Sequence, residues 1–174
     1  MVDSLEDPRR TDPPWTGPER EMLEGWLEFH RITLLLKCDG LGEAGRKARP
    51  VSTSLLSLHG LVRHMADVER NWFQRRLSGA DVPPLYYDFD QHPDGDFELL
   101  EDADWDADLA TWQAECQTAR ELAAERGLDD TFVHERLGVE ISLRWVYLHM
   151  IEEYARHNGH ADLIREMVDG SVGD

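Results

Sequence analysis

One stretch of the sequence is the strongest indication of the fold class: LRWVYLHMIEEYARHNGHADLIREMV, residues 143–168. It follows Ser142, which favours the start of a helix, and it is followed by Asp169-Gly170, a helix stop signal. A run of this length between a start signal and a stop signal predicts one long helix. The rest of the chain must then supply the partners against which its apolar side chains pack.

Three further helices are predicted upstream of this one. They cover residues 16 to about 38, residues 52–54 to about 79, and residue 102 or 104 to 127. The second of them carries an apolar seam at alternating spacings of three and four residues: Leu58, Leu61, Met65, Val68 and Trp72. Four long helices with little strand signal predict an all-α fold, a four-helix bundle.

The segments between the predicted helices differ in length. Residues 39–50 are rich in glycine and predict a loop, whereas residues 80–102 contain two adjacent prolines and predict a long crossover between helices two and three. Residues 128–141 form another connection, in which residues 131–133 can pair briefly as a strand. Residues 1–15 are polar and rich in proline, which predicts a flexible N-terminal arm before a single domain at residues 16–170.

The composition excludes some classes of function. Among 174 residues, 36 are acidic and 18 are basic, so the formal net charge is −18 and phosphate backbones are repelled. No apolar run approaches the roughly 20 residues that cross a bilayer, so we expect no membrane partner and a cytoplasmic protein. The two cysteines are too few for a disulfide scaffold, and Cys116 is predicted to be a small buried hydrophobe.

Acidic residues gather in one segment. Residues 81–108 contain eleven acidic residues and no Lys or Arg, so a local negative field lies on the crossover and the start of helix three. Within it, residues 90–101 place acids at loop positions resembling a calcium-binding EF-hand. Because His92 and Pro93 break that pattern and no entering helix precedes it, a solvated crossover is the preferred interpretation.

Possible metal ligands lie on the last helix. His149, Glu153, His157 and His160 follow one another at spacings of four, four and three residues, so all four share one helix face. Glu153 and His157 can therefore point at a single cation. A solvated helix face or a hydrogen-bonded core histidine remains the alternative for this spacing.

His64 supplies a possible third ligand. It lies between the apolar residues Leu61, Met65 and Val68 of helix two, and a buried imidazole needs a hydrogen-bond partner or a metal. If helices two and four are neighbours, His64, Glu153 and His157 form a three-ligand site. This donor set suits zinc, nickel, iron or manganese, with zinc and nickel preferred.

Two segments carry a family resemblance. LVRHMADVERNWF, residues 61–73, and HMIEEYARHNGHADLIRE, residues 149–166, resemble the signature segments of the DinB-like, or YfiT-like, superfamily of metalloenzymes. The resemblance implies an up-down-down-up bundle and a metal held by His64, Glu153 and His157. At the position of Glu153 the superfamily more often has a histidine. The maleylpyruvate isomerase branch resembles this chain in having a glutamate there. His149 or His160 would be a fourth ligand or a neighbour of the ligands.

The resemblance also implies a function. Relatives include mycothiol-dependent maleylpyruvate isomerases and bacillithiol transferases, so we expect a thiol S-transferase or isomerase acting on a small electrophile, with a low-molecular-weight thiol as cofactor. The alternative is a binding or stress-response module in which the metal only joins helices two and four. A homodimer is expected from the resemblance.

Several residues near the expected site receive a structural interpretation. Asp67 can orient a ligand imidazole, but surface salt bridges are the preferred interpretation for Asp67 and Glu69. Trp72 and Trp145 are expected in the core. No residue is assigned as a catalytic acid or base.

Overall fold

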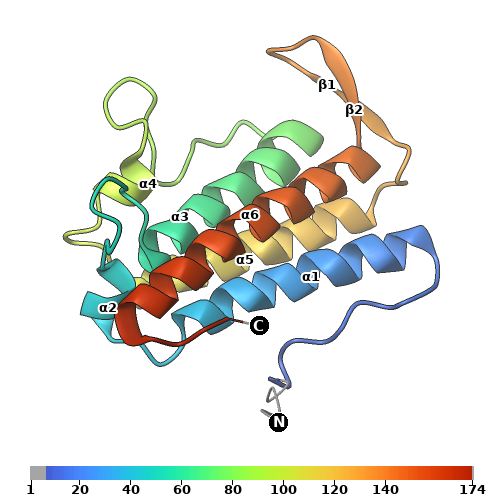
Figure 1. The fold of residues 1–174 in the computed structure, drawn as a ribbon. Coiled ribbons are helices and arrows are strands. Elements are labelled where there is room, and N and C mark those ends of the chain that lie inside the picture. The colour runs from blue at the N-terminus through green and yellow to red at the C-terminus, as the bar shows by residue number, and fades with distance from the viewer. Residues whose placement is uncertain (1–6, 174) are drawn as a thin grey trace.

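Four long helices make up most of the computed structural model, which describes residues 7–173. They are α1 (Glu19–Cys38), α3 (Leu58–Glu69) continued by the π-helical η1 (Arg70–Leu77), α5 (Trp105–Ala124) and α6 (Leu143–Asp169). Figure 1 shows α1 and α6 running in one direction and α3 and α5 in the other. Helix α6 packs against α1 and α3, and α3 also packs against α5. The mostly helical fold class is thus as predicted.

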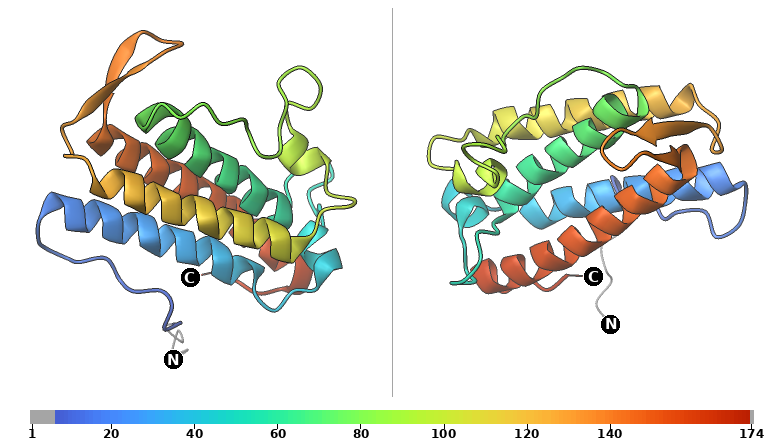
Figure 2. Two further views of the ribbon diagram at one scale, coloured as in Figure 1. Left: turned by 180° about the vertical axis from the view of Figure 1, so that it is seen from behind. Right: turned by 90° about the horizontal axis from the view of Figure 1, so that it is seen from above.

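The shorter elements lie in the connections. Helix α2 (Glu43–Lys47) interrupts the predicted loop, and α4 (Gly95–Glu98) lies in the crossover; neither was predicted. Strands β1 (Thr131–His134) and β2 (Val139–Ser142) form an antiparallel hairpin in which Thr131 pairs with Ser142, so the predicted short strand is confirmed. The hairpin stands at the start of α6, at the end of the molecule away from α2 and α4 (Figures 1 and 2).

Two predicted helix starts are wrong. Helix α1 begins at Glu19, after Pro18 rather than at Thr16. Helix α3 begins at Leu58, because Ser57 is its N-cap and accepts the Gly60 amide N–H at 3.1 Å. At the other end of the chain, Gly170 has a φ of +81°, the left-handed conformation expected of a helix C-cap glycine.

The predicted N-terminal arm is partly visible. Residues 1–6 lie outside the described residues. Residues 7–15 contain no helix and run along α1, where the Arg10 guanidinium lies 4.8 Å from the centroid of the Phe29 ring. The flexibility of the arm and the domain boundary at residue 16 stay predictions.

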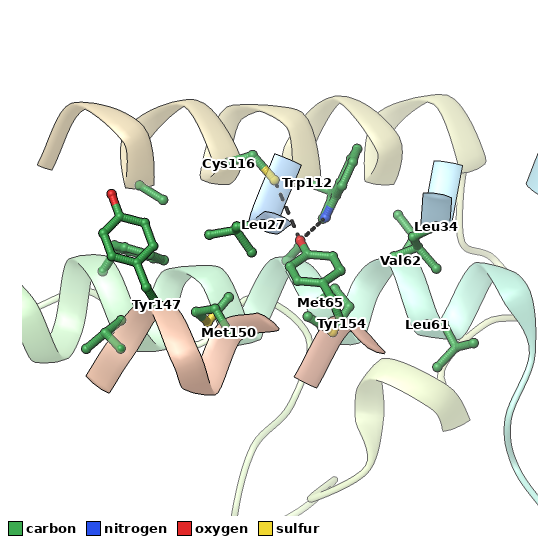
Figure 3. Packing of buried hydrophobic residues seen from close by; sticks show 14 of the residues in the cluster. Leu27, Leu34, Leu61, Val62, Met65, Trp112, Cys116, Tyr147, Met150 and Tyr154 are labelled. Atoms are coloured by element: carbon green, nitrogen blue, oxygen red, sulfur yellow. Dashed lines mark hydrogen bonds between the residues drawn. The ribbon is translucent and has the colours of Figure 1, made fainter. Parts of the chain in front are cut away.

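A polar network crosses the apolar core. The Trp112 indole Nε1 donates to the Tyr154 hydroxyl at 2.9 Å, and that hydroxyl donates to Glu69 Oε1 at 2.8 Å. Figure 3 shows the Tyr154 hydroxyl facing both Trp112 and Cys116, which approach it from the opposite helix. Cys116 is 2% exposed, which confirms that it is a small buried hydrophobe.

The network ends in a buried ion pair, which corrects the surface salt bridge predicted for Glu69. Both Arg31 and Glu69 are buried, and the guanidinium donates to the two carboxylate oxygens at 2.8 and 2.7 Å. Burial opposes the charge on Arg31, but the Glu69 carboxylate outweighs it and raises the pKa of Arg31 well above its usual value. The π-helical turn of η1 starts directly after this pair.

Candidate metal centre

The three predicted ligands lie together in the structure. His64 comes from α3, Glu153 and His157 come from α6, and one donor atom from each lies within 4.8 Å of the others. The rings of His64 and His157 meet at a centroid distance of 4.7 Å. A single cation can therefore contact all three side chains.

The electrostatics of the group suit a cation. His157 Nε2 lies 3.5 Å from Glu153 Oε2, one helical turn away. This contact with His157, assisted by the nearby His149, outweighs burial and lowers the pKa of Glu153 below its usual value. Glu153 is consequently ionised at neutral pH.

Asp96 holds His64 from the opposite side. Its Oδ2 lies 2.7 Å from His64 Nδ1, which leaves Nε2 as the ring nitrogen for a metal, and the Asp96 residue is 5% exposed. The Phe97 ring stacks on the His64 imidazole at 5.3 Å. Histidine ligands of metals commonly give their second nitrogen to a carboxylate in this way. Asp96 was not predicted as a site residue, because it is one of eleven acids in a segment interpreted as solvated.

Asp67 has neither of the roles weighed for it. It is 4% exposed and its two oxygens accept the backbone N–H groups of Leu85 and Tyr86 at 2.7 and 3.0 Å. Burial raises the pKa of Asp67, although these hydrogen bonds oppose the shift. Asp67 thus ties the crossover to α3, close to His64.

The two remaining histidines of the helix face adjoin the site. His160 Nδ1 lies 3.4 Å from His157 Nδ1, and His149 Nε2 lies 3.5 Å from Glu153 Oε1. His149, Glu152 and Glu153 also place one donor atom each within 4.8 Å of one another. Both histidines are therefore neighbours of the predicted ligands, and His160 is not simply a solvated surface residue.

Residues 90–101 do not assemble a calcium loop. Within residues 7–173, the groups of His, Cys, Asp and Glu close enough to share an ion are the two just described, and neither includes this segment. Asp88 and His92 form a bridge, α4 begins at Gly95, and Asp96 turns inward to His64. The acids of this segment thus serve the crossover instead of an EF-hand.

A pocket of about 280 Å³ opens beside the ligands. His64 and Glu153 form part of its wall, and further residues of α3, of η1 and of the crossover form the rest. The side chain of His64 is 27% exposed, so solvent reaches the site. Four carboxylates and no Lys or Arg line the pocket, which gives it a negative potential that attracts cations. These acids are Asp67, Asp94, Asp96 and Glu153.

Neither cysteine can act as a nucleophile in the folded chain. Cys38 and Cys116 are 1% and 2% exposed. Burial raises the pKa of Cys38 to about 12, and burial together with the Glu69 charge raises the pKa of Cys116 further.

No helix among the described residues is long and apolar enough to cross a membrane.

Comparison with known protein families identifies the family of this chain. The model of the mycothiol S-transferase family matches residues 22–170, a range that contains all four long helices except the first residues of α1. Comparisons with curated proteins and with solved structures gave no significant match. The matched range includes both segments that carry the DinB-like resemblance. The chain therefore belongs to the mycothiol S-transferase family, which is a DinB-like family.

Proposed function

We propose that this protein is a divalent-metal-dependent S-transferase that joins a low-molecular-weight thiol of the mycothiol type to a small electrophile. The carrying observation is that His64, Glu153 and His157 lie close enough to share one ion, and that two of them, His64 and Glu153, line a pocket that solvent reaches. A buried metal whose role is to join two helices would need no such pocket.

The donor set fits a divalent transition metal. Two imidazoles and one carboxylate are three protein ligands, and Asp96 already holds His64 with Nε2 available. Zinc and nickel are the preferred ions for these donors. When bound, such an ion would lower the pKa of a sulfhydryl group that approaches it, so that the thiolate is present near neutral pH.

The residues around the ligands have distinct roles in the proposed reaction. The thiol loses its proton, its sulfur forms a bond to an electrophilic carbon, and the leaving group departs with its electron pair. His149 Nε2, 3.5 Å from Glu153, accepts the sulfhydryl proton. Phe97 and Trp72, which line the pocket, offer apolar ring faces to the reacting molecules. Because both cysteines are buried, the nucleophilic sulfur comes from the cofactor.

Some features of the proposal concern the whole molecule. The four long helices are proposed to form the up-down-down-up bundle of the DinB-like proteins. An isomerase follows from the same attack when sulfur adds to a double bond and later leaves. The homodimer and the cytoplasmic location stay predictions.

Metal analysis of untagged protein tests the site. We expect about one metal ion per chain, and a loss of most of it in His64→Ala and in His157→Ala. His92→Ala is the control, because His92 is an exposed histidine that lies in the crossover and outside the group of predicted ligands. Equal metal content in all four proteins would overturn the site.

A turnover assay separates the enzyme from the helix-joining module. Monochlorobimane with mycothiol forms a fluorescent adduct as the carbon–sulfur bond forms and chloride leaves. We expect conjugation above the uncatalysed rate in metal-loaded protein, lost in His64→Ala. If the metal binds and raises thermal stability but conjugation stays at the uncatalysed rate with several cellular thiols, the helix-joining function is correct instead.

A further inference from the structure

A second pocket lies under the β1–β2 hairpin, next to the candidate metal centre. Its volume is about 480 Å³, and its wall comes from η1, the hairpin and the first turn of α6. Its lining includes two indoles, one imidazole and three aliphatic side chains: Trp72, His134, Leu137, Val139, Ile141 and Trp145. The pocket therefore offers a mainly apolar, aromatic surface.

The aromatic rings of this pocket are open to a ligand. Trp145 is 44% exposed, which corrects its predicted core position. Its ring lies 5.1 Å from that of Trp72 and stacks on His149 at 4.9 Å. Leu137 and Val139 of the hairpin are 63% and 48% exposed. A planar ring seated here would stack on indole and cover this apolar surface.

His134 supplies a polar anchor. The residue is 8% exposed and lines the pocket, and its Nδ1 is buried with no hydrogen-bond partner among residues 7–173. Its ring lies 6.2 Å from that of Trp72. A buried ring nitrogen without a partner is costly, so a rotation of the imidazole that brings this nitrogen to a ligand oxygen in the pocket is favoured. The pocket has no Lys or Arg in its lining and includes Glu140, which disfavours an anionic ligand.

We propose that the hairpin pocket binds a neutral, planar aromatic molecule that carries a carbonyl or nitro oxygen, and that this molecule is the electrophile of the reaction. The assignment of this molecule as the electrophile rests on the proposed function. It is supported by Trp72, which lines both this pocket and the pocket of the metal centre. The thiol and the electrophile then lie on two sides of one indole, beside His149.

Calorimetric titration of the metal-free protein tests the binding without any turnover. The probes are 1-acetonaphthone, a neutral aromatic ketone, and naphthalene, which has no oxygen. We expect saturable binding of the ketone, with Kd raised about tenfold or more in Trp145→Ala. Trp26→Ala is the matched control, because Trp26 is also 44% exposed but lies on α1. Equal Kd values in the two variants, or no saturable binding, would overturn the pocket.

Two hairpin variants test the anchor. His134→Phe should lose the preference for the ketone over naphthalene while it still binds naphthalene. Leu137→Ser changes a residue that is 63% exposed, so the fold should be kept, and it should weaken the binding of both probes alike. An unchanged preference in His134→Phe would contradict the polar anchor.

The KM values for the two substrates test whether the aromatic molecule bound in this pocket is the electrophile. With mycothiol and 1-chloro-2,4-dinitrobenzene, Trp145→Ala should raise KM for the aromatic substrate about tenfold and leave KM for the thiol unchanged. If Trp145→Ala weakens ketone binding but changes neither KM, the pocket binds aromatics without serving the reaction. If no variant or wild-type protein turns over, the proposed function fails while the binding result stands.

Discussion

Asp96 Oδ2 lies 2.7 Å from His64 Nδ1, although 32 residues separate the two positions. The pair joins α4, in the crossover, to the helix that supplies the first predicted metal ligand. Since such carboxylates fix the orientation and basicity of a ligand imidazole, Asp96→Asn should raise the Kd for zinc by about 10–100-fold. Asp94→Asn is the control, because Asp94 lines the same pocket but is exposed. Competition with a chelating dye measures both; similar Kd values would contradict this role.

Gly95 controls the same contact through the backbone. A Cβ at this position would overlap the carbonyl oxygen of Tyr86, and backbone atoms cannot move aside easily. Gly95→Ala should therefore displace α4 and weaken zinc binding about as much as Asp96→Asn. Gly159→Ala, where an added Cβ meets nothing within 4 Å, should keep full affinity. Full zinc affinity in Gly95→Ala would show that α4 is not held by this approach.

Breaking the buried pair of Arg31 and Glu69 is expected to destabilise the core. Glu69→Ala leaves the buried Arg31 guanidinium with only the partly exposed Glu28 carboxylate as an acidic partner, and it should lower the free energy of unfolding by about 3 kcal/mol. Tyr154→Phe leaves the Trp112 N–H without an acceptor and should cost about 1–3 kcal/mol. Glu121→Ala, on an exposed face of α5, should stay within about 0.5 kcal/mol of wild type in the same urea titration. A loss below 1 kcal/mol in Glu69→Ala would be incompatible with this assignment.

Asp108 should make stability depend on pH. Its Oδ2 lies 2.8 Å from Nε2 of the buried His59. Burial opposes the charge of Asp108, but His59, Tyr86 and Arg63 together outweigh burial and lower the pKa of Asp108 below 3.8. A carboxyl whose pKa is lower in the folded state stabilises the fold at pH values above its unfolded pKa, and this stability disappears as the pH falls through the folded value.

Asp108→Asn should therefore lower the free energy of unfolding by about 1–2 kcal/mol at pH 7, and the difference from wild type should shrink below about pH 4. Asp106→Asn removes a charge from the same first helical turn without this contact, so it is the matched control. A deficit that is equal at pH 7 and at pH 3 would rule out the ionised Asp108 carboxylate as the source of the stabilisation.

The two thiols should be inert in the folded protein. Because burial raises the pKa values of Cys38 and Cys116, native protein should react with iodoacetamide at pH 8 many times more slowly than urea-unfolded protein. Mass spectrometry counts the modified thiols. Rapid modification of either cysteine in native protein would reopen the possibility of a protein nucleophile.

Much of the fold and of the site was predictable because periodicity and motif spacing are local properties. Glu153 and His157 share a helix face by spacing alone, and His64 stood out as a histidine within an apolar seam. Asp96 and the Arg31–Glu69 pair were not predictable in this way, because their partners are 32 and 38 residues distant and an acid in the sequence carries no sign of its burial. Trp145 was misplaced because the hairpin, not the helix pattern, decides what covers it.

The three predicted ligands are distributed unequally along the chain. Two belong to one helical turn of α6, and the third arrives only when α3 docks against it. If these residues bind an ion as proposed, a partly folded chain with α6 formed would already bind it weakly through Glu153 and His157. The rise in affinity when His64 joins is then, by thermodynamic linkage, the factor by which the ion favours the docked helices over the undocked ones. The affinity of the chain for the ion would thus measure how completely α3 has docked against α6.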